Sequence, residues 1–125
     1  MLRDNATMAT IAVRSLATAR PFYEGKLGLQ PEEAGPGGTV VYRSGGSMFL
    51  VHESQFAGTN RATAATWTVG DDVEDIVGDL KAKGIAFEHY DLPGLKQKGD
   101  VHVADGMKAA WFKDPDGNIL ALVSG

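Results

Sequence analysis

The sequence predicts an α+β fold of two βαβββ modules, whose curved mixed sheets surround a cavity. The chain has 125 residues, which is typical of one domain spanning 1–125. A strand–helix–three-strand order occurs twice, over about 6–54 and 63–124. The 16 glycines cluster at turns between short apolar segments. In such modules one sheet face is covered by a helix, and the other face is free to line a cavity.

The first module begins with a strand from Met8 to Val13, where apolar and small side chains alternate. A short helix is expected next, because Thr18 is a suitable N-cap, Pro21 falls in the first turn and Gly28 can end the element. The Gly45-Gly46 pair predicts a hairpin. Three further strands are expected at Leu29 to Glu33, Thr39 to Arg43 and Ser47 to His52.

The second module repeats this order after a polar stretch. A strand is predicted from Ala64 to Val69, and Asp71 or Asp72 then caps a helix that Gly84 ends. The apolar side chains of this helix recur at helical spacing, at Val73, Ile76, Val77 and Leu80. The remaining strands are expected at Ile85 to Tyr90, Ala109 to Lys113 and Asn118 to Val123.

Composition disfavours several classes of function. The net charge of −4 offers no general attraction for nucleic acid. Cysteine is absent, which excludes disulfides and thiolate ligands. Apolar runs such as 48–51 are too short to cross a bilayer, and the first five residues lack a secretion signal. We therefore expect a cytoplasmic protein with no nucleic-acid or membrane partner.

Three motifs resemble those of the vicinal oxygen chelate superfamily, the glyoxalase/bleomycin-resistance/dioxygenase group. Its closing hairpin resembles Trp111-Phe112-Lys113-Asp114-Pro115-Asp116-Gly117-Asn118-Ile119. Its opening helix resembles Ser15-Leu16 followed by Pro21-Phe22-Tyr23 and Leu27-Gly28-Leu29. The start of its second helix resembles Val69-Gly70-Asp71-Asp72-Val73. Because the motifs occur in the family's order from one end of the chain to the other, the resemblance implies the fold of that superfamily.

The resemblance also bears on metal binding. Members such as glyoxalase I and extradiol dioxygenases hold a divalent ion with His, Glu or Gln from four strands. The matching positions here are Met8, Leu50, Ala64 and Ala121. None of these side chains is a ligand for zinc, iron or nickel. His52, His89 and His102 lie on different segments, and no pair has the short spacing of a metal motif. We therefore expect neither the usual metal site nor a cofactor.

Five residues are predicted to contact a ligand. His52 follows Leu50 by two positions, so strand alternation puts both on the face that would line the cavity. By the resemblance, Met8 also lies at a cavity position, and Trp111 matches an apolar substrate-contacting position. The Trp111 indole could stack on a planar ligand, and the Tyr42 phenol could orient a polar one. No catalytic residue is identified.

Three functions remain open from sequence. The first is a protein that binds a small, partly aromatic molecule without a metal, as bleomycin-resistance-type members do, commonly between two subunits. The second is a metal-dependent lyase, isomerase or dioxygenase of the same superfamily. The third is a structural homodimer whose cavity is vestigial. If the chain is an enzyme, the resemblance implies a glyoxalase- or dioxygenase-like lyase or oxidoreductase, and for all three we expect a homodimer.

Overall fold

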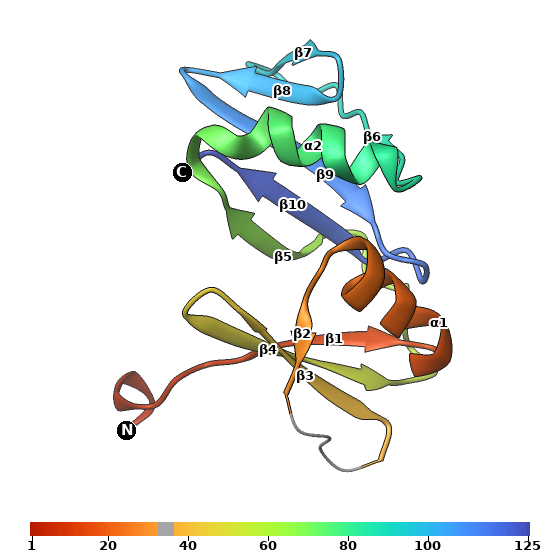
Figure 1. The fold of residues 1–125 in the computed structure, drawn as a ribbon. Helices are drawn as coiled ribbons and strands as arrows, with labels where there is room; N and C mark the ends of the chain where they lie inside the picture. Colours follow the sequence, from red (N-terminus) through yellow and green to blue (C-terminus); the bar gives the residue numbers. More distant parts are fainter. Residues whose placement is uncertain (33–36) are drawn as a thin grey trace. The chain divides into compact units, whose positions relative to one another are not determined.

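The computed structural model describes residues 1–32 and 37–125, so Glu33 of the predicted third segment lies outside the described residues. The chain forms two compact units, Met1–Asn60 (unit one) and Arg61–Gly125 (unit two). Each unit contains one mixed sheet and a helical segment (Figure 1), in agreement with the predicted α+β class.

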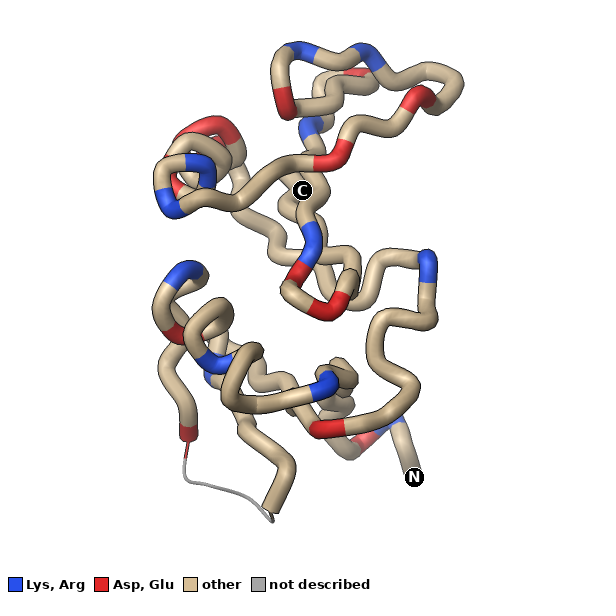
Figure 2. The backbone as a smooth tube through the Cα atoms, turned by 90° about the vertical axis from the view of Figure 1, so that its right-hand side faces the viewer, with Lys and Arg blue, Asp and Glu red and all other residues tan. Residues whose placement is uncertain are grey.

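Charged residues are spread along both units. Figure 2 shows acidic and basic positions interspersed through the described chain, without a long run of either sign. Within the described ranges, no helix is long and apolar enough to cross a bilayer.

Unit one has a four-stranded sheet in the order β1-β4-β3-β2. Strand β1 runs parallel to β4, and the other neighbours are antiparallel. The predicted Gly45-Gly46 hairpin joins β3 to β4. The elements are η1 (Leu2–Asp4), β1 (Ala9–Val13), α1 (Leu16–Arg20), η2 (Pro21–Lys26), β2 (Gln30–Pro31), β3 (Thr39–Ser44) and β4 (Ser47–Glu53).

The first helix starts earlier than the sequence predicts. Ser15, not Thr18, is the N-cap, although its side chain makes no capping hydrogen bond. Instead, the Leu16 N–H donates to Glu53 Oε2 at 3.0 Å, so a carboxylate from β4 satisfies one of the free donors at this helix end. At Pro21 the helix widens into the π-helical turn η2.

The core of unit one lies between its sheet and these helical turns. Tyr23 of η2 is fully buried, and its ring centroid lies 6.1 Å from that of Phe49 on β4. The alternating residues that point to the same side are all buried, namely Ile11, Val13, Val40, Tyr42, Phe49 and Val51. Among the described residues of unit one, the helical turns therefore cover one sheet face and leave the other helix-free.

Unit two has a six-stranded sheet with the path β5-β10-β9-β8-β7, and β6 pairs separately with β9. Strand β5 is parallel to β10, which repeats the β1–β4 arrangement of unit one. The elements are β5 (Thr63–Thr68), η3 (Gly70–Asp72), α2 (Val73–Ala82), β6 (Phe87–Glu88), β7 (Lys96–Lys98), β8 (Val101–Ala104), β9 (Met107–Lys113) and β10 (Ile119–Val123).

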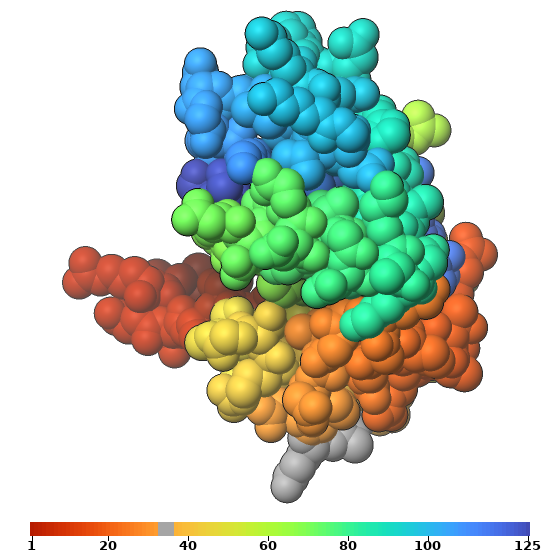
Figure 3. Space-filling model, turned by 45° about the horizontal axis from the view of Figure 1, so that its top comes forward, coloured from red at the N-terminus to blue at the C-terminus, as the bar shows by residue number. Residues whose placement is uncertain are grey.

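Helix α2 forms where the apolar spacing predicts it. Val73, Val77 and Leu80 are buried, Ile76 is half-buried, and α2 packs on β9. Asp72 is the N-cap residue, as predicted, without a side-chain capping bond. The outer side of α2, drawn in green, is at the surface (Figure 3). The helix therefore covers one face of the second sheet.

Two strands of unit two, β7 and β8, were not predicted from sequence. A two-residue turn at Asp105-Gly106 joins β8 to β9, and both residues have left-handed φ values of 49° and 79°. Such a pair is typical of a type I′ hairpin. The strand predicted from Ile85 to Tyr90 is shorter than expected, because the Tyr90 N–H donates to the His102 side chain instead of to a neighbouring strand.

Candidate functional site

Two of the predicted ligand contacts share the helix-free face of unit one. Leu50 and His52 of β4 flank Val51, which is fully buried on the covered face. In the sheet register His52 lies between Ala12 of β1 and Thr39 of β3. Both Leu50 and His52 are half-buried. Strand alternation therefore puts these two side chains on one face, as the sequence predicts.

Tyr42 lies on the opposite, covered face, which corrects its expected place beside the ligand. Its side chain is fully buried, and its ring stacks on Tyr23 with centroids 5.8 Å apart. The Tyr42 hydroxyl donates to Glu24 Oε2 at 2.8 Å. Burial, and secondarily this hydrogen bond, raises the pKa of the Tyr42 phenol above its ordinary value. The parity of β3 explains the error, because Val41 and not Tyr42 pairs with Leu50.

Trp111 occupies the helix-free face of unit two. It is half-buried, whereas its neighbours Ala110 and Phe112 on β9 are fully buried on the helix-covered face. In the sheet register Trp111 lies between Ala121 of β10 and Glu88 of β6. Trp111 is thus flanked by strands on both sides, and its indole is partly accessible.

Two further rings pack against Trp111, and together we call these three residues the Trp111 cluster: Tyr90, His102 and Trp111. The ring centroids of His102 and Trp111 lie 4.9 Å apart at an interplanar angle of 77°. Those of Tyr90 and Trp111 lie 5.2 Å apart at 74°. Both arrangements are edge-to-face, a geometry favoured for aromatic pairs.

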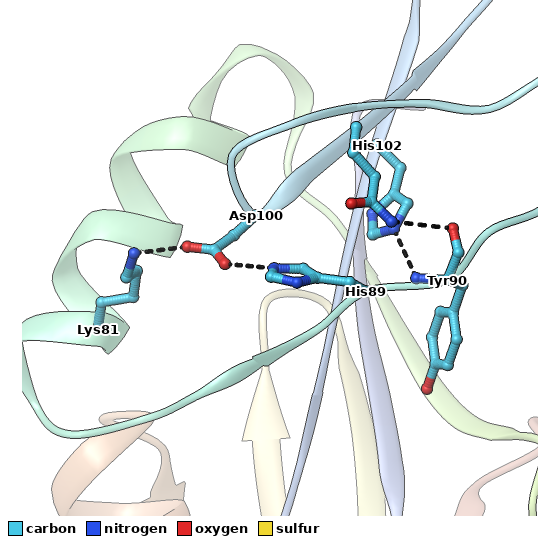
Figure 4. A network of polar contacts seen from close by, with 6 residues as sticks. Lys81, His89, Tyr90, Asp100 and His102 are labelled. Atoms are coloured by element: carbon cyan, nitrogen blue, oxygen red, sulfur yellow. Dashed lines mark hydrogen bonds and ion pairs between the residues drawn. The ribbon is translucent and has the colours of Figure 1, made fainter.

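His102 is the most deeply buried polar residue of the Trp111 cluster. It has 0% exposure, and its Nε2 accepts a 3.0 Å hydrogen bond from the Tyr90 backbone N–H (Figure 4). Its Nδ1 is buried and has no hydrogen-bond partner within the described residues. Buried ring nitrogens are normally paired, so this atom requires an explanation.

Two opposite charges border the Trp111 cluster. Lys113 Nζ lies 3.4 Å from Glu88 Oε1, and the register puts Glu88 beside Trp111. Burial, followed by the negative charge of Glu88, raises the pKa of the Tyr90 phenol, and Lys113 acts in the opposite direction. The site therefore combines aromatic surface with a carboxylate, an ammonium group and a phenol, the mixture usual in small-molecule sites.

An ion network fastens the backbone next to the cluster. Asp100 accepts from Lys81 Nζ of α2 at 2.6 Å and contacts His89 Nε2 at 2.7 Å (Figure 4). The hydrogen bond from Lys81, and then that from His89, lowers the pKa of the Asp100 carboxyl. Because His89 precedes Tyr90 in the chain, this network helps to hold Tyr90 against His102.

The four positions that the resemblance matches to the family's metal ligands are Met8, Leu50, Ala64 and Ala121. Met8 directly precedes β1 and is 42% exposed, whereas Leu50 lies on the helix-free face of unit one. Ala64 is skipped in the irregular register between β5 and β10, and Ala121 lies within β10. None of the four side chains carries a nitrogen or oxygen donor. Across residues 1–32 and 37–125, no group of three His, Asp or Glu side chains could hold a metal ion.

Sequence reasoning missed Tyr90 and His102 as members of the site. The available signal was the Asp105-Gly106 pair, a strong hairpin motif between two apolar segments. Had this hairpin been recognised, its register would have paired His102 with Ala109, two residues before Trp111. Residues two apart on a strand share a face, so the two rings would have been expected on one side of the sheet.

Comparisons with known proteins agree with this architecture. The family model of the Glyoxalase/Bleomycin resistance protein/Dioxygenase superfamily matches residues 6–122. No curated protein matches the chain in sequence.

Three solved structures illustrate the likeness in fold. An integron cassette protein from the mobile metagenome of the Halifax Harbour sewage outfall has a TM-score of 0.72 at 17% identity, covering 97% of this chain and 98% of its own. A lactoylglutathione lyase from Agrobacterium tumefaciens has a TM-score of 0.70 at 21% identity, covering 95% and 92%. The fosfomycin resistance protein FosX from Mesorhizobium loti has a TM-score of 0.69 at 14% identity, covering 98% and 92%. At these identities the likeness concerns the fold alone.

Proposed function

Because the chain belongs to the Glyoxalase/Bleomycin resistance protein/Dioxygenase superfamily, we propose that it binds a small, partly aromatic molecule without a metal centre. The observation that carries this proposal is the Trp111 cluster on the helix-free face of unit two. Trp111 is half-buried, and two other rings pack against it edge-to-face. A planar ligand stacked on such a preformed aromatic surface gains roughly 0.5–1.5 kcal/mol beyond the area that it buries.

The polar groups around the cluster support a specific orientation of the ligand. Glu88 and Lys113 provide one charge of each sign, and the Tyr90 hydroxyl has no hydrogen-bond partner within the described part of the chain. A few polar groups around an apolar surface are typical of sites for small molecules. Leu50 and His52 on unit one, together with Met8, are proposed as further ligand contacts.

The side chains at the positions of the family's metal ligands support binding without a metal. The four positions that carry ligands in metal-dependent relatives hold methionine, leucine and two alanines. Chemistry that polarises vicinal oxygens through a divalent ion needs nitrogen or oxygen donors at such positions. We therefore propose sequestration of a ligand in place of metal-assisted catalysis.

The experiment is a fluorescence titration with 2-acetonaphthone, a planar aromatic ketone. Trp111→Phe keeps an aromatic ring in the cluster and removes the indole, so ligand-dependent quenching should largely disappear. The matched control is Trp67→Phe, because Trp67 pairs with Leu122, a residue buried on the helix-covered face. This control should retain the quenching. If Trp67→Phe abolishes the signal and Trp111→Phe preserves it, the ligand does not bind at the Trp111 cluster.

A further inference from the structure

We propose that the buried Nδ1–H of His102 is a fixed donor that recognises an uncharged carbonyl oxygen, and that the ligand is therefore a planar aromatic carbonyl compound. This inference rests on the proposed function and specifies its ligand class. The observation behind it is the juxtaposition of an unpartnered, fully buried imidazole nitrogen with the ring of Trp111.

The protonation state of His102 follows from its one hydrogen bond. The Tyr90 backbone N–H can only donate, so His102 Nε2 must accept with its lone pair. A neutral imidazole with a free Nε2 lone pair carries its hydrogen on Nδ1. An imidazolium would instead place an Nε2–H against the Tyr90 N–H. The structure therefore assigns a single donor, Nδ1–H, to the buried side of this ring.

A ligand is the partner that best explains this donor. Buried polar groups without a partner are rare and usually mark a binding role or an ordered water. The His102 ring lies 4.9 Å from that of Trp111 and 6.3 Å from that of Tyr90, so a molecule stacked on Trp111 is next to it. The half-buried Tyr90 ring packs beside the rings of both His102 and Trp111, and its backbone N–H is bound to His102. In the proposed complex, a rotation of the Tyr90 side chain brings the carbonyl oxygen of the stacked ligand to Nδ1.

The single donor selects a neutral oxygen over a charged one. A carboxylate taken out of water loses far more hydration than one neutral N–H can replace. A ketone or quinone carbonyl loses little, and one hydrogen bond compensates for it. Glu88 and Lys113 at the same cluster are paired with each other at 3.4 Å, so together they offer an anion no net positive charge. These charges and donors together favour an aromatic ketone or quinone over an aromatic acid.

The test compares three probes of nearly equal shape: 2-acetonaphthone, 2-isopropylnaphthalene and 2-naphthoate. Affinities are measured by calorimetry for the wild-type protein and for His102→Gln. In this variant the glutamine Oε1 can still accept from Tyr90 N–H, but the donor at the Nδ1 position is lost. We expect the affinity ratio of ketone to hydrocarbon to fall by roughly 10-fold. His102→Asn, which keeps a donor at the Nδ1 position, should retain most of the ratio.

The control is Trp67→Phe, because Trp67 pairs with Leu122 on the helix-covered face of unit two and lies outside the cluster. It should leave the ratio unchanged. Nitrogen-15 NMR of the wild-type protein provides a measurement that needs no variant. The His102 ring should show a protonated Nδ1 that shifts when 2-acetonaphthone is added.

If the wild-type protein binds none of the probes, the proposed function fails and this inference fails with it. If ketone and hydrocarbon both bind but His102→Gln leaves their ratio unchanged, only the inference fails. Preference for 2-naphthoate, or an Nε2-protonated ring in the NMR spectrum, overturns the assignment of a neutral carbonyl.

Discussion

The substitution Tyr42→Phe tests how much the buried Tyr42 hydroxyl stabilises unit one. Tyr42→Phe preserves the ring that stacks on Tyr23 and deletes the hydroxyl that donates to Glu24 Oε2 at 2.8 Å. A hydrogen bond to a charged partner contributes roughly 1.5–3 kcal/mol. Glu24 keeps the Arg20 guanidinium at 2.7 Å and is 27% exposed, so water replaces part of the loss. We expect the free energy of unfolding to fall by about 1–2 kcal/mol.

The assay is differential scanning calorimetry at neutral pH. With an unfolding entropy of about 2.1 cal/mol/K for each residue, this loss lowers the Tm of a 125-residue chain by roughly 4–8 °C. The control is Tyr90→Phe, whose hydroxyl has no hydrogen-bond partner within the described chain and whose removal should change Tm by no more than about 2 °C. Equal Tm values for wild type and Tyr42→Phe would refute the reasoning.

The same hydroxyl predicts a pH dependence above neutrality. The folded-state pKa of Tyr42 is raised, so folding favours the protonated phenol. Its contribution is fully present below the ordinary tyrosine pKa of about 10 and is lost as the pH rises above it, because the unfolded chain ionises first. Between about pH 10 and 11 the Tm of the wild type should fall more steeply than that of Tyr42→Phe. Parallel slopes would contradict the raised pKa.

Three further predictions concern metal, ligand and assembly. After mild dialysis, mass spectrometry of the elements should find far less than one divalent ion per chain; a stoichiometric ion that is lost when His52 and a second histidine are changed would overturn this. His52→Ala should weaken binding of 1,4-naphthoquinone, whose second carbonyl can accept from the imidazole, by about 1–2 kcal/mol, whereas an unchanged affinity removes His52 from the site. Light scattering should show a homodimer, because β1 and β5 are open sheet edges; a particle of 13.2 kDa at micromolar concentration would exclude it.

The parts of the fold that were predicted correctly depend on local patterns. Alternation identified β3 and β4, and apolar spacing identified α2 together with its buried Val73, Val77 and Leu80. The start of α1 could not be found in this way. Its N-terminal donor is satisfied by Glu53, a residue 37 positions away along the chain. A contact of that kind arises only from the folded sheet, so a search for a local cap selected Thr18 instead.

The candidate site was predicted only in part for a similar reason. Trp111 and Leu50 were selected through resemblance, and His52 through its strand parity with Leu50. Tyr42 was assigned to the site without asking which sheet face its side chain takes in β3. Because Val41 pairs with Leu50, alternation would have placed Tyr42 on the opposite face, in the core. The importance of His102 depends on a hydrogen bond to the backbone of Tyr90, and no pattern of side-chain types encodes such a bond.

The most direct measurement of the central claim, ligand binding without a metal, is a calorimetric titration of 2-acetonaphthone before and after treatment with a chelator. The four substituted ligand positions predict equal dissociation constants for the treated and untreated protein, and no change when manganese or zinc is added back. Loss of binding after chelation, with recovery on addition of a divalent ion, would contradict the account.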